Sequence, residues 1–213
     1  RSTDRIAILF MRRGRNAEIF EEELSNGNVP YFYGMFTDED IDYVGFHDRC
    51  QELFIKRFGK SKSINKKALI AFVESVETYY ANSTKKTIAS LLRLLYALAE
   101  KVSVDYSDLP SEDKYTLLLN IFENRQIKQA MEYVDSQVTL STVHGAKGLE
   151  WDYVILPDIE QWVLTFACGS CTSPDKNNNK ISYCRLPTKI PETMKKAILD
   201  DLCLFYVGLS RAK

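Results

Sequence analysis

The stretch at residues 138–156 constrains the fold of this chain more than any other part of the sequence. Two apolar runs, at residues 138–142 and 153–156, have the length and composition of strands. Between them lies a polar turn that holds His144, Lys147, Gly148 and Glu150. Because open α/β sheets place their functional sites where strands end, the sequence predicts a site at this turn.

The turn and its flanking strands resemble motif V of the UvrD/Rep/PcrA-type DNA helicases of superfamily 1. The matching positions are Leu140, Thr142, His144, Lys147, Gly148, Leu149, Glu150 and Trp151. The last residues of the sequence, 205–213 (FYVGLSRAK), resemble motif VI of the same family. The two motifs stand in the order that the family requires, so each supports the other.

The N-terminal part predicts a strand, a helix and a second strand. Residues 5–11 form a continuous apolar run of the kind found in a buried parallel strand. Helix formers follow at residues 16–24, and a short strand at residues 29–34 ends in a glycine. The unit resembles motif IV of the same helicases. The resemblance implies an α/β fold, with a RecA-like (P-loop NTPase-type), mostly parallel sheet and a helical insertion.

The insertion is expected between the second and third strands, where the apolar spacing becomes helical. The predicted helices cover residues 41–58, 64–80, 88–102 and 115–131. UvrD-type helicases carry an inserted accessory domain at this place. The predicted division is therefore residues 1–36, the first part of a second RecA-like lobe; residues 37–136, a reduced accessory domain; and residues 137–213, the remainder of the lobe.

Motif VI supplies the first candidate for catalysis. In phosphoryl transfer the protein mainly positions the reactants and neutralises charge, and an arginine from a second lobe contributes ~10³ to 10⁵ in rate. The resemblance assigns this arginine finger to Arg211. The alternative is that Arg211 serves only as a cation at the C-terminal end of a helix, which is also a favourable place.

Motif IV supplies a second phosphate contact, Arg12, and an aromatic residue at the nucleotide, Phe10. The register departs from the family by one residue, because Met11 separates the two. Arg13 or Arg15 could therefore hold the phosphate-facing position instead. The alternative is that all three arginines are solvated loop residues, because exposed arginines are common.

The turn of motif V is implied to bind both nucleotide and DNA. Glu150 would accept hydrogen bonds from the nucleotide ribose. Gly148 either lets the backbone approach the nucleotide closely or simply serves the turn. Thr142, His144 and Lys147 would hold the phosphates and sugars of single-stranded DNA, which are contacts without sequence information.

Three other patterns are predicted to be structural. Trp151 is expected in the core rather than as a base-stacking platform. Residues 59–61 (GKS) repeat the end of a phosphate-binding loop, but Phe54 stands where that motif needs a glycine, so a basic turn is expected. Residues 153–158 (YVILPD) imitate a strand that ends in a magnesium-binding aspartate, but Pro157 and the position after motif V favour a structural strand.

Composition and charge exclude several classes. The net charge of -1 gives no general attraction to polyanions, so binding of nucleic acid would need a local cluster of cations. No apolar run approaches the ~20 residues of a membrane span, so no membrane contact and a cytoplasmic location are predicted. The cysteines, five in number, fit reduced thiols. No metal is expected, since a structural zinc site would need a second close pair beside Cys168, Cys171, Cys184 and Cys203.

No complete glycine-rich phosphate-binding loop occurs in these residues. By resemblance, ATP with Mg²⁺ would be held mainly by an N-terminal RecA-like lobe of the same parent protein, and single-stranded DNA would be the other partner. The sequence is thus predicted to be the C-terminal lobe of an ATP-dependent DNA helicase or translocase, excised from a longer protein and inactive alone.

Two alternatives stay open at this point. One is a non-catalytic, helicase-derived module that binds nucleic acid or protein, because the register of motif IV is altered. The family's arginine pair before motif VI is also absent, with Leu202 and Cys203 in its place. The other alternative is the helicase part of a helicase–nuclease.

Overall fold

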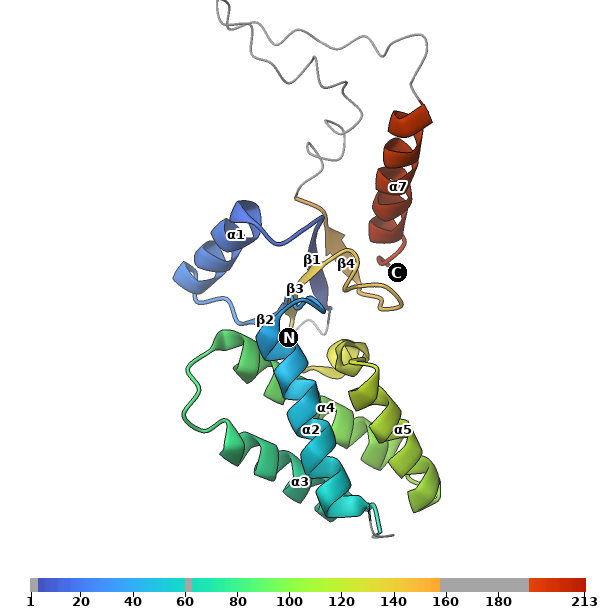
Figure 1. Ribbon diagram of the computed structural model, residues 1–213. Coiled ribbons are helices and arrows are strands. Elements are labelled where there is room, and N and C mark those ends of the chain that lie inside the picture. Colours follow the sequence, from blue (N-terminus) through green and yellow to red (C-terminus); the bar gives the residue numbers. More distant parts are fainter. Residues whose placement is uncertain (1–3, 60–62, 158–191) are drawn as a thin grey trace, which may run out of the picture.

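The computed structural model describes residues 4–59, 63–157 and 192–213, and it places helices on both faces of a parallel sheet (Figure 1). The elements in chain order are β1 (Ile6–Phe10), α1 (Arg15–Asn26), β2 (Tyr31–Gly34), α2 (Ile41–Phe58), α3 (Lys66–Tyr79), α4 (Lys86–Val104), α5 (Ser111–Glu123), the 3₁₀ helix η1 (Ile127–Tyr133), β3 (Val138–Thr142), β4 (Tyr153–Ile155) and α7 (Glu192–Leu209).

The strands of the described residues form one sheet with the order β2-β3-β1-β4, and every neighbouring pair is parallel. β1 lies between β3 and β4, so that Ile6 is opposite both Val138 and Tyr153. The helices between β2 and β3 form the insertion. The predicted α/β fold, with a parallel sheet and a helical insertion, is therefore confirmed.

β1 is buried on both faces because successive side chains point to opposite sides of the sheet. Ile8 and Phe10 face α1, where the rings of Phe10 and Phe20 lie edge to face with centroids 5.6 Å apart. Ala7 and Leu9 face the other way, toward the core that the sheet shares with the helical insertion. This two-sided burial explains the continuous apolar run in the sequence.

The helical insertion forms a layer beside the sheet, below it in Figure 1. Phe54 is fully buried at its centre. Four rings surround it, with centroids 4.9 to 5.5 Å from its own: Phe58, Phe72, Tyr115 and Phe122. The core continues through Phe36 and Phe32 to the sheet, so the insertion and the sheet share one hydrophobic cluster. The division of the chain at residues 36 and 136 stays a prediction.

Arg93 ties the insertion to the edge of the sheet. Its guanidinium, on α4, donates to the carbonyl of Tyr31 (3.4 Å) and to the carbonyl of Asp135 (3.0 Å). It also lies over the ring of Phe32, 5.4 Å from the centroid. Because both acceptors are backbone groups, the contact fixes α4 against β2 and against the segment that leads into β3.

The prediction of one helix over residues 115–131 is wrong. α5 ends at Glu123, and Arg125 takes a left-handed conformation with φ 54°. Its N–H donates to the carbonyl of Phe122 (3.2 Å), and the N–H of Gln126 donates to the carbonyl of Ile121 (2.9 Å). This pair of bonds is a Schellman motif, which ends the helix and redirects the chain into η1. The apolar spacing continues across the break, which is why the sequence pattern did not indicate it.

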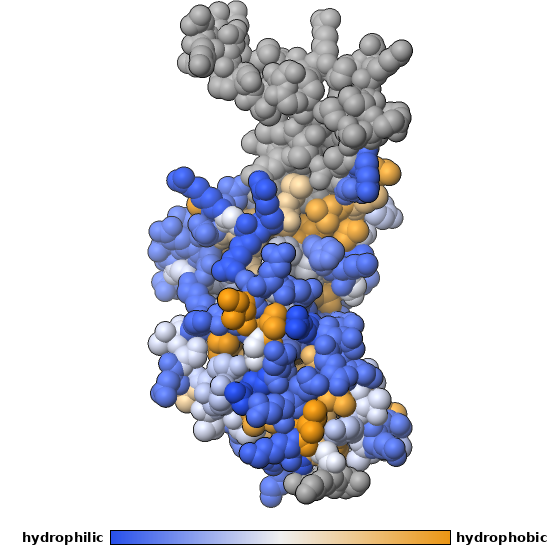
Figure 2. All heavy atoms as spheres, viewed as in Figure 1, coloured by the Kyte–Doolittle hydropathy of each residue, from blue (hydrophilic) through white to orange (hydrophobic). Residues whose placement is uncertain are grey.

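The surface around β4 and α7 carries many apolar residues. Figure 2 shows hydrophobic residues gathered where these two elements meet. Ile155, Leu202 and Leu209 are each at least 45% exposed. Among the described helices none is long and apolar enough to cross a membrane.

Candidate functional site

The carboxyl ends of β1 and β3 bring two of the predicted motifs together. Phe10 lies opposite Thr142, and its carbonyl accepts a hydrogen bond from the N–H of Val143 (2.9 Å). The next residues leave the sheet at this edge, and among them Arg12 and His144 are exposed. The main chain of Arg12 and the start of the motif V turn therefore share one end of the sheet. We call this end, formed by the carboxyl ends of the strands, the carboxyl edge.

Thr142 shapes the turn. It is 8% exposed, and its Oγ1 accepts a hydrogen bond from the N–H of Gly145 (3.0 Å). Its carbonyl accepts the N–H of Ala146 (2.9 Å). With the backbone fixed in this way, the side chains of His144 and Lys147 are exposed to solvent. The turn thus presents an imidazole and an ammonium group to solvent.

Gly148 has the left-handed conformation that favours glycine, with φ +86°. Among the described residues, no atom lies within 4 Å of the position that a Cβ would take there. The turn therefore requires glycine for its backbone conformation and not because a neighbour crowds it. The open space beside Gly148 leaves room for a ligand.

After Gly148 the chain returns to the other end of the sheet, where β4 begins. We call this end, formed by the amino ends of the strands, the amino edge. There the N–H of Trp151 donates to the carbonyl of Arg211 (2.9 Å), and the N–H of Lys213 donates to the carbonyl of Trp151 (2.9 Å). Trp151 is 1% exposed, which confirms its prediction as a core residue. Glu150 lies next to this bridge with an exposed side chain.

The guanidinium of Arg211 is partly buried and is held by three neutral acceptors. Nε donates to the carbonyl of Val207 (3.2 Å), Nη2 to Oγ of Ser210 (3.0 Å) and Nη1 to the carbonyl of Leu149 (3.3 Å). The bond to Val207 caps α7, whereas the bond to Leu149 places the group beside the backbone of Glu150. A guanidinium has five N–H donors, so two have no acceptor among the residues that the structure describes.

The main chain at Arg12 follows the carboxyl end of β1, whereas the carbonyl of Arg211 accepts the N–H of Trp151, before the amino end of β4. The guanidinium of Arg211 reaches back along α7 to the carbonyl of Val207 (3.2 Å). A Cβ at the next residue, Gly208, would lie 3.6 Å from Val143, which directly follows β3. That Arg12 and Arg211 reach one γ-phosphate stays a prediction.

The side chain of Phe10 is 0% exposed and packs against α1. Its contact with a nucleotide stays a prediction. Of the alternative arginines, Arg13 forms an ion pair with Asp40 (3.3 Å), and Arg15 is exposed at the start of α1. All three arginines are exposed, so exposure does not decide which of them would hold the phosphate-facing position.

Arg5 contacts the motif V turn, although no sequence pattern indicated it. Its Nη2 donates to the carbonyl of Glu150 (3.1 Å), and its Nη1 donates to the carbonyl of Glu132 (2.5 Å). Its backbone N–H donates to Oδ2 of Asp152 (2.7 Å). No pattern in the sequence distinguishes Arg5 from other cations that flank strands, because its partners depend on the order of the strands.

Several other predicted features are structural or fall outside the described residues. Gly59 ends α2, so a helix and not a strand precedes the GKS sequence, as predicted. Cys203 is exposed and has a free thiol. In the part of the chain that the structure describes, no group of His, Cys, Asp or Glu side chains is placed to hold a metal ion. The residues that lie outside the described ranges are Lys60, Ser61, Asp158, Cys168, Cys171 and Cys184.

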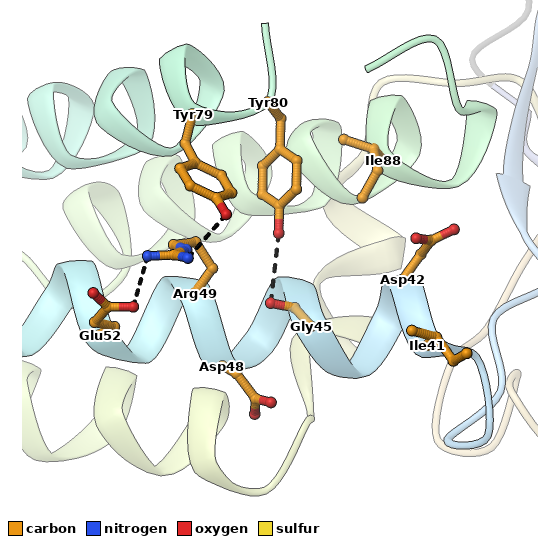
Figure 3. A pocket seen from close by; sticks show the side chains of 9 residues that line it. All are labelled: Ile41, Asp42, Gly45, Asp48, Arg49, Glu52, Tyr79, Tyr80 and Ile88. Carbon is orange, nitrogen blue, oxygen red and sulfur yellow. Dashed lines mark hydrogen bonds and ion pairs between the residues drawn. The ribbon is translucent and has the colours of Figure 1, made fainter. Parts of the chain in front are cut away.

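A groove of about 380 Å³ lies in the helical insertion, between α2, the end of α3 and the start of α4 (Figure 3). It contains none of the predicted site residues. Two of its carboxylates are already paired, Asp42 with Lys85 (2.7 Å) and Glu52 with Arg49 (2.7 Å). Burial raises the pKa of Tyr80 to about 12, so its hydroxyl stays protonated. The groove is therefore a polar surface feature separate from the motif V turn.

Comparisons with known proteins point to one family. The model of the UvrD-like helicase C-terminal domain matches residues 46–213. The ATP-dependent DNA helicase UvrD2 of Mycobacterium tuberculosis (strain ATCC 25618 / H37Rv) is 24% identical over 216 residues, which cover 98% of this chain and 26% of that protein. A component of the ATP-dependent helicase/nuclease of Lactococcus lactis subsp. lactis (strain IL1403) is 25% identical over 169 residues, which cover 74% of this chain and 12% of that protein. The chain thus spans about a quarter or less of the length of these relatives.

Proposed function

Because this chain belongs to the UvrD-like helicase C-terminal domain family, we propose that it is the second RecA-like lobe of an ATP-dependent DNA helicase or translocase. ATP with Mg²⁺ would be gripped by a first lobe that carries the phosphate-binding loop. This lobe would complete the site when the cleft between the lobes closes, and hydrolysis would require both.

The part of the lobe that would face the nucleotide is the surface around Arg211 and Glu150, next to the bridge at Trp151. We call it the nucleotide edge. The observation that carries the proposal is the bond from Nη1 of Arg211 to the carbonyl of Leu149 (3.3 Å), which holds a permanent positive charge next to the backbone of Glu150. The two remaining N–H donors of the guanidinium match the oxygens of a phosphate. The exposed carboxylate of Glu150 can accept hydrogen bonds from ribose hydroxyls. Arg211 would act as the finger that stabilises charge on the γ-phosphate.

The part of the lobe that would face DNA lies at the carboxyl ends of β1 and β3, where His144 and Lys147 follow Thr142 in the turn. We call it the DNA edge. Their imidazole and ammonium groups are exposed, as contacts with the DNA backbone require. Thr142 would act mainly by holding the turn, because its Oγ1 already binds the backbone of Gly145. Arg12, which follows the carboxyl end of β1, keeps its proposed role at the γ-phosphate.

The residues of motif V connect the two edges. The chain runs from Thr142 at the DNA edge to Glu150 at the nucleotide edge within one short turn. A movement that closes the lobe on ATP would therefore also move the residues that hold DNA. This connection gives hydrolysis a physical route to translocation along a single strand.

The decisive test is Arg211→Ala in a protein that contains both lobes. We expect ATP turnover at saturating DNA to fall by about 10³-fold or more, since the finger contributes ~10³ to 10⁵. Binding of a single-stranded oligonucleotide should be unchanged, because Arg211 is not among the residues proposed to contact DNA. The matched control is Lys213→Ala, which removes an exposed cation two positions away and leaves its backbone bond to Trp151 in place.

Two results would refute the proposal. If the Arg211→Ala protein hydrolyses ATP within a few-fold of the parent rate, Arg211 is not an arginine finger. ATP hydrolysis by residues 1–213 alone would show that the chain holds a phosphate-binding site of its own. Circular dichroism of each variant must first show that the fold is retained, because Arg211 also caps α7.

A second candidate function is the helicase part of a helicase–nuclease. It is favoured by the similarity to the Lactococcus lactis protein, whose name includes both helicase and nuclease. The two candidates differ in products. An intact parent protein that shortens linear DNA in an ATP-dependent reaction supports the second candidate, whereas separated strands of full length support the first.

A further inference from the structure

Arg5 connects three parts of the molecule through backbone carbonyls. Its side chain stands at the amino end of β1, level with the bridge between Trp151 and the end of motif VI. The two Nη atoms donate to different segments: one to Glu150 in the motif V turn (3.1 Å), and the other to Glu132 in η1 of the helical insertion (2.5 Å). A planar group with diverging donors suits this bridging position, which a lysine with a single nitrogen could not fill in the same way.

The backbone of Arg5 strengthens the same connection. Its N–H donates to Oδ2 of Asp152 (2.7 Å), and its carbonyl accepts the N–H groups of Asp152 and Tyr153 (both 3.1 Å). The segment from Glu150 to Tyr153 is therefore held to Arg5 by the carboxylate of Asp152 and by backbone hydrogen bonds. Bonds to ionised groups are about twice as strong as neutral ones.

We propose that Arg5 is a positioning residue for nucleotide binding, which fixes the main chain of Glu150 and anchors it to the helical insertion. The inference rests on the proposed function, because it takes Glu150 as the residue that meets the ribose. Arg5 itself need not touch the nucleotide. Its guanidinium donates hydrogen bonds to the two carbonyls, and Arg5 acts by keeping the carboxylate of Glu150 in place.

The consequence is a link between the insertion and the nucleotide edge. η1 begins directly after the left-handed turn at Arg125 and packs against α4. A displacement of η1 would pull on the carbonyl of Glu132 and, through Arg5, on the backbone of Glu150. The insertion could thereby alter nucleotide affinity without forming any part of the nucleotide site.

The structure offers a matched control for this inference. Arg93 also joins the insertion to the sheet through two backbone carbonyls, those of Tyr31 and Asp135, but at the β2 edge, away from Glu150. Arg5→Met and Arg93→Met therefore remove the same kind of clamp with the same loss of charge. Only the first should disturb the nucleotide.

The experiment measures the dissociation constant of a non-hydrolysable ATP analogue, together with the KM for ATP and kcat, in the parent protein with both lobes. We expect Arg5→Met to weaken binding of the analogue by about fivefold or more, as loss of one well-placed hydrogen bond does. The KM for ATP should rise with it, whereas kcat at saturating ATP and the affinity for single-stranded DNA should stay within about twofold. Arg93→Met should leave all four quantities within about twofold.

The outcomes separate the inference from the proposed function. If Glu150→Ala leaves the affinity for the analogue unchanged, the ribose contact is wrong and the inference is overturned with it. If Glu150→Ala weakens binding but Arg5→Met and Arg93→Met behave alike, the inference alone is overturned. Should Arg5→Met fail to fold, Asp152→Ala loosens the same segment from its other partner, and it must weaken binding of the analogue for the inference to stand.

Discussion

Gly148 allows a test of the motif V turn in which the same substitution at two glycines should have opposite effects. A side chain in the left-handed region costs roughly 1–2 kcal/mol, because Cβ approaches the following carbonyl. Gly148 has φ +86°, and an added Cβ would meet no described atom within 4 Å. The cost of Gly148→Ala is therefore conformational and not steric, and we expect the free energy of unfolding to fall by about 1 kcal/mol.

Gly45 is the matched control. It lies within α2, and its would-be Cβ likewise meets no described atom within 4 Å. Because glycine in a helix costs roughly 0.5–1 kcal/mol relative to alanine, Gly45→Ala should raise the free energy of unfolding by about that amount. Gly148→Asn should lie between the parent and Gly148→Ala, since asparagine tolerates the left-handed region better than other side chains.

Urea denaturation followed by circular dichroism measures these differences, and a change of 1 kcal/mol corresponds to roughly 2–4 °C in Tm for a domain of this size. The reasoning is refuted if both alanine variants change stability in the same direction. The KM for ATP, measured with both lobes present, then decides between the two roles of Gly148. A KM that rises in Gly148→Ala indicates close approach of the nucleotide, and an unchanged KM leaves the glycine with the turn alone.

Two further predictions concern the helical insertion. Phe54→Ala should lower the free energy of unfolding by about 3–5 kcal/mol, because it removes a fully buried ring from among four others; urea denaturation measures the loss, and a value below about 1 kcal/mol would contradict the packing described. His47 is 1% exposed, and its Nδ1 must carry a proton because it faces the carbonyl of Tyr43 (2.8 Å). Burial is the main cause that lowers the pKa of His47, and the positive charges of Lys128 and Arg125 lower it further. As the pH falls, the unfolded chain therefore takes up a proton at this histidine before the folded protein does. The free energy of unfolding keeps its full value above about pH 6.5 and decreases below it, by up to ~1.4 kcal/mol per pH unit. His47→Phe should remove this part of the slope between about pH 7.5 and 5, and identical slopes in the two proteins would rule out the assignment.

The sequence was informative wherever local chemistry decides the structure. The bounds of β3 and α2 were predicted without error, because an apolar run between polar residues and a helical apolar spacing are both local signals. The pattern failed at Arg125, where a helix ends in a left-handed arginine. Since arginine has no particular preference for that conformation, only the bonds to Ile121 and Phe122 reveal the break.

The sequence motifs nominate the residues of the candidate site but do not predict its geometry. Motifs IV, V and VI were recognisable, yet their order along the chain does not tell which edge of the sheet each one reaches. The chain passes from the carboxyl end of β3 to the amino end of β4 within the motif V turn, and this separates the main chain of Thr142 from that of Trp151. The role of Arg5 was equally hidden, because its three partners come from segments that meet only when the strands are ordered.

The parallel bridge between Trp151 and Ala212 has a mechanical consequence. It fastens the end of motif VI to the end of the motif V turn, with the large buried indole as its anchor. In the proposed two-lobed helicase, Arg211 and Glu150 would then move together when the cleft closes on ATP. A cross-link between residues 151 and 212 should therefore leave ATP turnover by that protein unchanged.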